Sequence, residues 1–409
     1  MKNKLLIIGF VWPEPKSSAA GSRMLQLISF FQQQDYQLTF VSTCAKSDNA
    51  FDVSTIGVEK ARIKLNDSSF DDFILKLKPD VVMFDRFMTE EQFGWRVSAQ
   101  CPEAIKLLDT EDLHFLRRAR QQAFKDNSET INAYLFSDTT KREIASIYRC
   151  DLSLIISKVE MELLKNTFHI DNFLLCYLPF LIDDISEEEI KNFPTFNERQ
   201  HFVTIGNFIH EPNYDALLYL KNTLWKTIRK QLPNVELHNY GAYASQKVNQ
   251  LHNEKEGFLI KGFAKDVNEV MQQAKVCLAP IRFGAGLKGK LFDAMQNGTP
   301  FVTTNIGIEG IVDDVNQDFI CDDASDFITH SIAVYQDESL WKQQQSDGFD
   351  ILKKRFLKSE FESQFTERLT ELSKTLKTHR QYNFIGQMLQ HHTMQSTKFM
   401  SKWIEAKNS

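Results

Sequence analysis

No cysteine arrangement that would organise a fold is found in this sequence. The six cysteines are scattered through 409 residues and none forms a CxxC pair. This spacing excludes zinc ribbons and thioredoxin motifs and argues against a disulfide framework. We therefore expect a reducing compartment.

Long hydrophobic runs and an excess of positive charge are absent as well. No apolar stretch approaches the ~20 residues that cross a bilayer. The run at residues 5–12 superficially resembles a secretion signal, but residues 13–16 interrupt it, so we expect a buried first strand and a loop. Lysine and arginine number 48 against 54 aspartates and glutamates, a net charge of −6, which argues against a nucleic-acid binder. Any anion-binding site must therefore come from a local group of positive charges.

The rest of the composition is that of a globular chain. Hydrophobic residues make up 42% and charged residues 25%, which excludes a disordered or fibrous protein. The chain is too long for one ordinary core, because domains typically hold ~100–200 residues. The sequence therefore predicts two lobes.

Short apolar runs alternate with helical patterns in both halves of the chain. Such alternation is typical of a parallel sheet covered on both faces, with binding sites at the carboxyl ends of the strands. An acid-rich stretch at residues 183–200 is the expected linker, and the pattern becomes helical after about residue 327. The predicted strands are 5–11, 38–42, 81–84, 105–108 and 152–156 in the first lobe, and 202–205, 235–240, 258–260, 276–279 and 301–303 in the second.

Residues 279–300 carry the most informative pattern. A predicted strand ends at Ala279, a glycine-containing loop carries Lys288 and Lys290, and a helix of about two turns follows. Free N–H groups and the helix dipole favour an anion at such a helix start, and glycines let a phosphate approach closely. Asp293 lies on the same helical face as Lys290, where a carboxylate can accept ribose hydroxyls. The alternative is a solvated loop with two surface lysines.

Neither of the common phosphate-loop motifs fits this segment. No GxxxxGK[ST] sequence occurs, which excludes a Walker A loop. Gly284, Gly286 and Gly289 have the GxGxxG spacing of dinucleotide-binding folds, but they follow a late strand rather than open a first βαβ unit. Glu309 has the distance of the expected acid, but it lies in a turn. The segment therefore lacks the sequence context that a dinucleotide-binding dehydrogenase requires.

A longer motif surrounds this segment. Its order is G-x-G at 284–286, Lys290, an acid at 293, Gly298-x-Pro300 and Gly307-x-Glu309-Gly310, and it extends back through Gly206-Asn207, residues 212–216, Gly241, Gly262-Phe263 and the loop 13–23. With this order, over about residues 5 to 325, the chain resembles the retaining glycosyltransferases of the GT-B fold, particularly the bacterial family 4 group (glycosyl transferases group 1).

The resemblance implies a GT-B architecture, in which two doubly wound, Rossmann-like α/β domains face each other across a cleft. We expect an acceptor domain over residues 1–185 and a nucleotide-sugar donor domain over 200–350. Residues 351–409 would form helices that cross back to the first domain, with Trp403 and Ile404 as anchors.

The resemblance also implies that the second lobe binds a nucleoside-diphosphate sugar. Lys288, Lys290 and the helix start would hold the diphosphate, and Asp293 the ribose. The other residues expected to face the donor are Gly21, Arg23, Gly206, Asn207, Gly241, Phe263, Arg282, Gly284, Gly286, Gly307 and Glu309.

Two departures from the family pattern bear on mechanism. The first of a frequent glutamate pair would fall at Ala285, and the frequent arginine and lysine are missing from residues 207–211. No DxD triplet occurs, so we expect neither metal nor cofactor; Lys288, Lys290 and the helix dipole would stabilise the departing diphosphate instead. In retaining relatives the acceptor hydroxyl is thought to attack on the leaving-group face.

Residues 109–114 follow another predicted strand and hold three acids and a histidine. Asp109 and His114 are the expected catalytic residues on the acceptor side, together with Lys290. The alternative is that Asp109 or Thr110 caps the following helix. The basic run 117–125 either touches acidic lipid head groups or is a solvated helix face.

The sequence therefore predicts a metal-independent, retaining, hexosyltransferase-type glycosyltransferase of bacterial surface-polysaccharide or glycoconjugate assembly. The expected partners are a nucleotide-sugar donor and a glycan, lipid-linked or protein acceptor, without nucleic acid. We expect a cytoplasmic protein, with peripheral contact at the cytoplasmic face of the inner membrane as an option. Two alternatives stay open: a GT-B sugar-nucleotide epimerase, and a catalytically silent member that acts as an interaction subunit.

Overall fold

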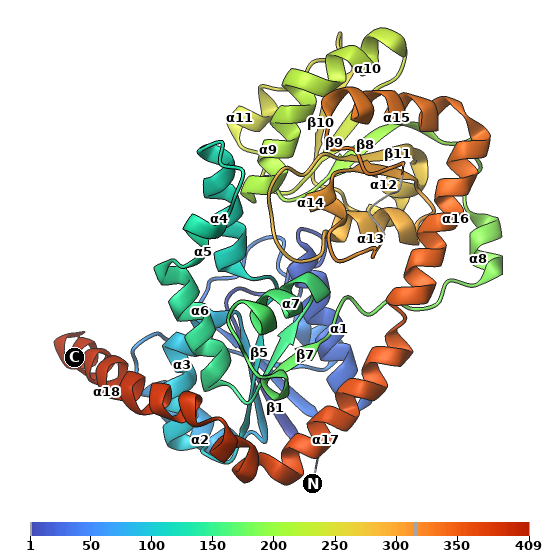
Figure 1. Ribbon diagram of the computed structural model, residues 1–409. Helices are drawn as coiled ribbons and strands as arrows, with labels where there is room; N and C mark the ends of the chain where they lie inside the picture. The colour runs from blue at the N-terminus through green and yellow to red at the C-terminus, as the bar shows by residue number, and fades with distance from the viewer. Residues whose placement is uncertain (1, 314–317, 409) are drawn as a thin grey trace.

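The computed structural model describes residues 2–313 and 318–408 and forms two α/β domains, with the last helices running back along the first (Figure 1). The expected architecture of two parallel sheets is confirmed. The first sheet has the order β3-β2-β1-β4-β5-β6-β7. Its strands are β1 (Lys4–Gly9), β2 (Gln37–Ser42), β3 (Glu59–Arg62), β4 (Val81–Asp85), β5 (Ile105–Asp109), β6 (Leu152–Ile155) and β7 (Leu175–Tyr177).

Alternate residues of these strands fill two cores, one on each face of the sheet. In β1, Leu5 and Ile7 face one core while Leu6 and Ile8 face the other, as the two-residue period of a strand requires. The covering helices and short 3-10 turns are α1 (Ala19–Gln33), η1 (Val53–Ile56), α2 (Ser69–Leu77), α3 (Phe87–Gln100), α4 (His114–Lys125), α5 (Asn132–Leu135), α6 (Asp138–Arg149), α7 (Lys158–Asn166) and η2 (Asn172–Leu174).

The second sheet has five parallel strands in the order β10-β9-β8-β11-β12. They are β8 (Gln200–Ile205), β9 (Leu237–Tyr240), β10 (Phe258–Gly262), β11 (Ala274–Ala279) and β12 (Phe301–Thr303). The accompanying helices are α8 (Glu187–Asn192) in the linker, α9 (Glu211–Tyr219), η3 (Leu220–Leu224, a π-helical turn), α10 (Trp225–Gln231), α11 (Gln246–Asn249), α12 (Val267–Gln273), α13 (Gly289–Gln296), α14 (Asn305–Ile308), α15 (Ala324–Gln336) and α16 (Glu338–Arg355). Strands β8 and β11 are neighbours although helices α9 to α12 and strands β9 and β10 separate them in sequence, so the loops after them meet at a switch point, where α/β sheets commonly bind ligands.

The last two helices return to the first domain, as expected for this fold. Helix α17 (Lys358–Tyr382) adds Phe365 to the core beside Phe30, with ring centroids 4.9 Å apart. Helix α18 (Phe384–Asn408) lies against α3 and α6. The expectation that Trp403 anchors this helix is wrong, because its side chain is 63% exposed; Ile404 is half-buried. None of the described helices is both long and apolar enough to cross a membrane.

Candidate functional site

The loop between β11 and α13 meets the first domain directly. Gly286 has a φ of 63°, and a Cβ there would lie 2.8 Å from Cβ of Asp112 in the first domain. A Cβ at Gly289 would lie 2.6 Å from Cβ of Ala19, at the start of α1. The glycines thus let the predicted phosphate-binding loop approach the opposite domain, and Gly286 also needs its left-handed backbone.

Lys288, Lys290 and Asp293 are half-buried at the start of α13. Burial lowers the pKa of each lysine to about 8, and burial raises the pKa of Asp293 to about 7 even though Lys290 opposes that shift. No side chain in the described part of the chain donates a hydrogen bond to the Asp293 carboxylate. Titratable groups whose pKa is shifted in this way are candidates for binding a charged ligand.

The neighbouring loop after β8 positions Lys290. The Lys290 ammonium donates to Oδ1 of Asn213 at 3.0 Å, and the amide of Asn213 donates to the carbonyl of Asn207. Predicted donor residues from two strand ends are therefore brought together. Arg282 differs: its guanidinium forms a bidentate ion pair with Asp215 at 2.7 and 2.9 Å and lies over the ring of Phe124 in the first domain, 4.6 Å from its centroid, so it is already engaged rather than free for a phosphate.

His210, which sequence reasoning missed, stands next to these lysines. His210 is exposed to solvent on one side. Its pKa is nevertheless lowered to about 4, because neighbouring protein atoms remove part of the water around the imidazole and because Arg117, Lys288 and Lys290 lie nearby. A neutral imidazole here can donate or accept one hydrogen bond. It occupies the segment where the family's arginine and lysine are missing.

The other predicted glycines have packing reasons of their own. A Cβ at Gly21, Gly206, Gly241 or Gly307 would lie 2.0 to 2.6 Å from other atoms of this chain. A Cβ at Gly284 would make only ordinary contacts, the nearest at 3.7 Å to Lys288. Phe263 follows β10 with a 38% exposed side chain, which leaves its ring face available to a flat partner.

Hydrogen bonds and ion pairs join the two domains around and beside this loop. Arg120 of α4 forms a bidentate ion pair with Glu309 at 2.6 and 2.7 Å and also donates to the carbonyl of Gly284. The backbone N–H of Gly286 donates to Glu160 of α7 at 2.9 Å. The hydroxyl of Tyr243 lies 2.9 Å from both carboxylate oxygens of Glu14. Glu309, predicted to face the donor sugar, is therefore held by the first domain.

Asp109 and Arg23, predicted as a catalytic and a donor-binding residue, form a buried ion pair. Nε of Arg23 lies 3.0 Å from Oδ1 of Asp109, and both side chains are at most 1% exposed. Arg23 also donates to the carbonyls of Leu178 and Pro179. The pair lies beneath the surface, so it can position the end of β5 but does not reach a ligand.

His114 is nearly buried at the start of α4. Burial lowers its pKa to about 3, so the imidazole is neutral at physiological pH and a weak base. Nε2 lies 3.5 Å from Asp112, whose pKa falls to about 2 because Arg117 and His114 outweigh its burial. The alternative that Asp109 or Thr110 caps α4 is not what the structure shows: Leu113 occupies the cap position.

Glu111 and Arg86 lie just after two predicted strands, in segments where the sequence places binding residues. They follow neighbouring strands β5 and β4, and both have a left-handed backbone, with φ of 62° and 69°. Burial and the Asp109 charge raise the pKa of Glu111 well above its usual range. Within the described residues its carboxylate has no hydrogen-bond or ion-pair partner, although Arg86 is near enough to oppose the shift. Strained, non-glycine positions of this kind often lie at functional sites.

A metal centre is not formed by the residues that the structure describes, since no group of three or more histidine, cysteine, aspartate or glutamate side chains is placed to hold an ion.

Comparisons with known proteins show the fold of the chain and a family match within the second domain. Residues 199–337 match the family model of glycosyl transferases group 1. A comparison with curated proteins finds no match. Among solved structures, sucrose-phosphate synthase from Thermosynechococcus elongatus shares 14% identity over 91% of this chain and 99% of that chain, with a TM-score of 0.67.

Two further structures were solved with UDP. HepE of Anabaena, in complex with UDP and glucose, shares 12% identity over 90% of this chain and 100% of that chain, with a TM-score of 0.65. The TarM G117R mutant of S. aureus, in complex with fondaparinux, α-GlcNAc-glycerol and UDP, shares 14% identity over 74% of this chain, with a TM-score of 0.57. This chain spans 58% of the length of that TarM chain.

Proposed function

We propose that this protein transfers a sugar, with retention, from a nucleoside-diphosphate sugar to an acceptor hydroxyl. The GT-B fold of the chain and the match of residues 199–337 to glycosyl transferases group 1 support this proposal. UDP is the first candidate nucleotide, because HepE and TarM were solved with UDP. A hexosyl donor is the proposed sugar class.

The observation that carries this proposal is the pair of half-buried lysines at the start of α13. Breaking the glycosidic bond leaves negative charge on the diphosphate, so the largest catalytic need is to stabilise that charge. Lys288, Lys290 and the free N–H groups of α13 supply positive charge there. We propose that they act without a metal ion or cofactor, and that Asp293 accepts the ribose hydroxyls.

The acceptor side of the proposed site lies at the ends of β4 and β5. Glu111 has a free carboxyl group there, and we propose that it orients the acceptor hydroxyl, with neutral His114 nearby. A glycan, a lipid-linked saccharide or a protein hydroxyl fits this role. We place the reaction in the cytoplasm, in bacterial surface-polysaccharide or glycoconjugate assembly.

The test is UDP binding by calorimetry, with EDTA present, to the wild type, Lys290→Ala and a matched control. Lys247→Ala removes an exposed lysine of α11 and is the control. We expect UDP to bind the wild type and the control alike, and Lys290→Ala to bind at least ~10-fold more weakly, as loss of a charge-assisted contact implies.

The pH dependence of the same measurement adds a second arm. Each lysine has a pKa of about 8, so it loses its charge as the pH rises above 8 and the dissociation constant of UDP should increase. Equal UDP affinity in the wild type, Lys290→Ala and Lys247→Ala would show that Lys290 does not bind the donor. Turnover of a UDP-sugar without acceptor would instead favour the epimerase, and binding without any turnover the silent subunit.

A further inference from the structure

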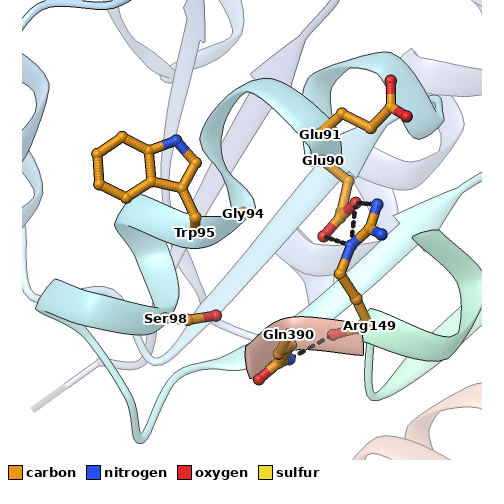
Figure 2. A pocket seen from close by; sticks show the side chains of 7 residues that line it. All are labelled: Glu90, Glu91, Gly94, Trp95, Ser98, Arg149 and Gln390. Atoms are coloured by element: carbon orange, nitrogen blue, oxygen red, sulfur yellow. Dashed lines mark hydrogen bonds and ion pairs between the residues drawn. The ribbon is translucent and has the colours of Figure 1, made fainter. Parts of the chain in front are cut away.

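One side of α18 is fastened to the first domain. The side-chain amide of Gln390 donates to the carbonyl of Arg149 at 2.8 Å, and Arg149 in turn pairs with Glu90 of α3 (Figure 2). Within the last two turns of α18, Arg96 of α3 contacts Glu405 at 2.6 Å and Ser401 at 3.2 Å. These contacts, at both ends of the helix, fix its rotation about its own axis.

The opposite side of α18 carries large apolar side chains that are exposed, although the Lys407 ammonium lies 5.2 Å from the centroid of the Trp403 ring. At 3.6 residues per turn, they lie on the half of the helix away from Gln390, Ser401 and Glu405. Their side chains are between 44% and 66% exposed. They are Phe384, Ile385, Met388, Phe399, Met400 and Trp403, and we call this set the apolar face of α18.

The net charge of α18 is positive. It carries Lys398, Lys402 and Lys407, and its single acid, Glu405, is already paired with Arg96. The chain as a whole has a net charge of −6. An amphipathic helix with aromatic residues on its apolar side and lysines beside them binds the interface of anionic lipid, since the lipid supplies both apolar depth and negative charge.

We propose that the apolar face of α18 lies in the surface of an anionic phospholipid bilayer. A second copy of this chain fits less well: a symmetric interface would bring two copies of this lysine-bearing helix together, with no free carboxylate of α18 to neutralise the lysines. The basic run on α4 is not this surface, because Arg117 pairs with Asp112 and Arg120 with Glu309. The proposal does not depend on the donor chemistry.

Trp403 makes the proposal directly measurable. The other four tryptophans, Trp12, Trp95, Trp225 and Trp341, are at most 7% exposed. We expect vesicles of phosphatidylglycerol and phosphatidylcholine to shift the emission of the full chain to shorter wavelength, and brominated lipid to quench it. Trp403→Phe should keep binding in co-sedimentation and lose the emission change, which assigns the signal to α18.

Further variants separate apolar insertion from charge. Phe399→Ser with Met400→Ser should abolish co-sedimentation, and Lys402→Glu should weaken it about fivefold or more, since each lysine near an anionic surface contributes about 1 kcal/mol. Leu65→Ser, another exposed apolar position, is the control and should bind as the wild type does. Circular dichroism checks that α18 stays helical in each variant.

Two results would overturn the proposal. One is the absence of binding to anionic vesicles by the wild type. The other is sedimentation of the lipid-free protein as a dimer that Phe399→Ser dissociates, because the apolar face would then be covered by a second copy. Failure of UDP binding would leave vesicle binding unaffected, so the two proposals fail separately.

Discussion

Glu111 is the single residue whose environment differs most from that of an ordinary surface carboxylate. It combines a left-handed backbone with a carboxyl group that has no hydrogen-bond or ion-pair partner among residues 2–313 and 318–408, beside the buried Asp109–Arg23 pair. Holding such a conformation costs of order 1–3 kcal/mol, which the surrounding fold must offset. A side chain held at that cost and left without a contact is a candidate for contact with substrate.

We expect Glu111→Gln to lower kcat/KM for the acceptor by about 2- to 10-fold, the range implied by ~0.5–1.5 kcal/mol for a hydrogen bond between uncharged groups, because burial favours the protonated Glu111 carboxyl group. UDP affinity should stay within about threefold, because the residue lies on the acceptor side. Steady-state kinetics with a soluble acceptor and calorimetry with UDP measure the two effects. Glu129→Gln, an exposed glutamate after α4, is the control. Unchanged acceptor kinetics would exclude the role.

At the scale of elements, the start of α4 is held by other helices rather than by its own cap. Leu113 at the cap position offers no side-chain acceptor. Glu143 of α6 accepts from the N–H groups of His114 and Phe115, and Glu160 of α7 from that of Leu113. The four free N–H groups of a helix start need such partners when buried.

Burial raises the pKa of Glu143 to about 8. Its unfolded value is near 4.5, so its contribution to stability is fully present below pH 4.5 and is lost as the pH rises toward 8. We expect the free energy of unfolding to fall over this interval, by up to about 1.4 kcal/mol per pH unit for this proton. Glu143→Gln cannot titrate and should show a flatter profile in urea melts between pH 5 and 8, whereas exposed Glu188→Gln should keep the slope of the wild type. Parallel profiles for all three proteins would contradict this account.

The elements also show what a sequence can and cannot predict. Apolar runs predict buried strands, and β1, β5 and β11 lie where expected. Strand β3, whose sequence Glu-Lys-Ala-Arg is polar, was missed because it lies at the sheet edge and buries little. The lysines at 288 and 290 stand at a helix start as the loop motif predicts. Glu143 and Glu160, which cap α4, lie 29 and 47 residues from the N–H groups that they bind. Tertiary packing brings them there, and no local sequence pattern predicts it.

For the whole molecule, the question is how the two domains hold the site together. Arg120 and Glu309 are 189 residues apart, and only the fold brings them into contact. The side chains are 13% and 17% exposed, so water screens the pair only weakly. Glu309 can thus act through the domain contact or, as the sequence predicts, through the donor sugar.

A double-mutant cycle distinguishes these two roles of Glu309. If Glu309 acts only through Arg120, then Arg120→Gln, Glu309→Gln and the double variant should lose similar amounts of transfer rate, since each breaks the same ion pair. Small-angle scattering should show a larger radius of gyration in all three variants, with UDP affinity within about threefold of the wild type.

If Glu309 contacts the donor sugar, Glu309→Gln should lose more transfer rate than Arg120→Gln, and the double variant should show the sum of the two effects. Arg142→Gln, which breaks an exposed ion pair within the first domain, controls for loss of an arginine. We expect the non-additive result, because in the structure both carboxylate oxygens of Glu309 are already occupied by Arg120.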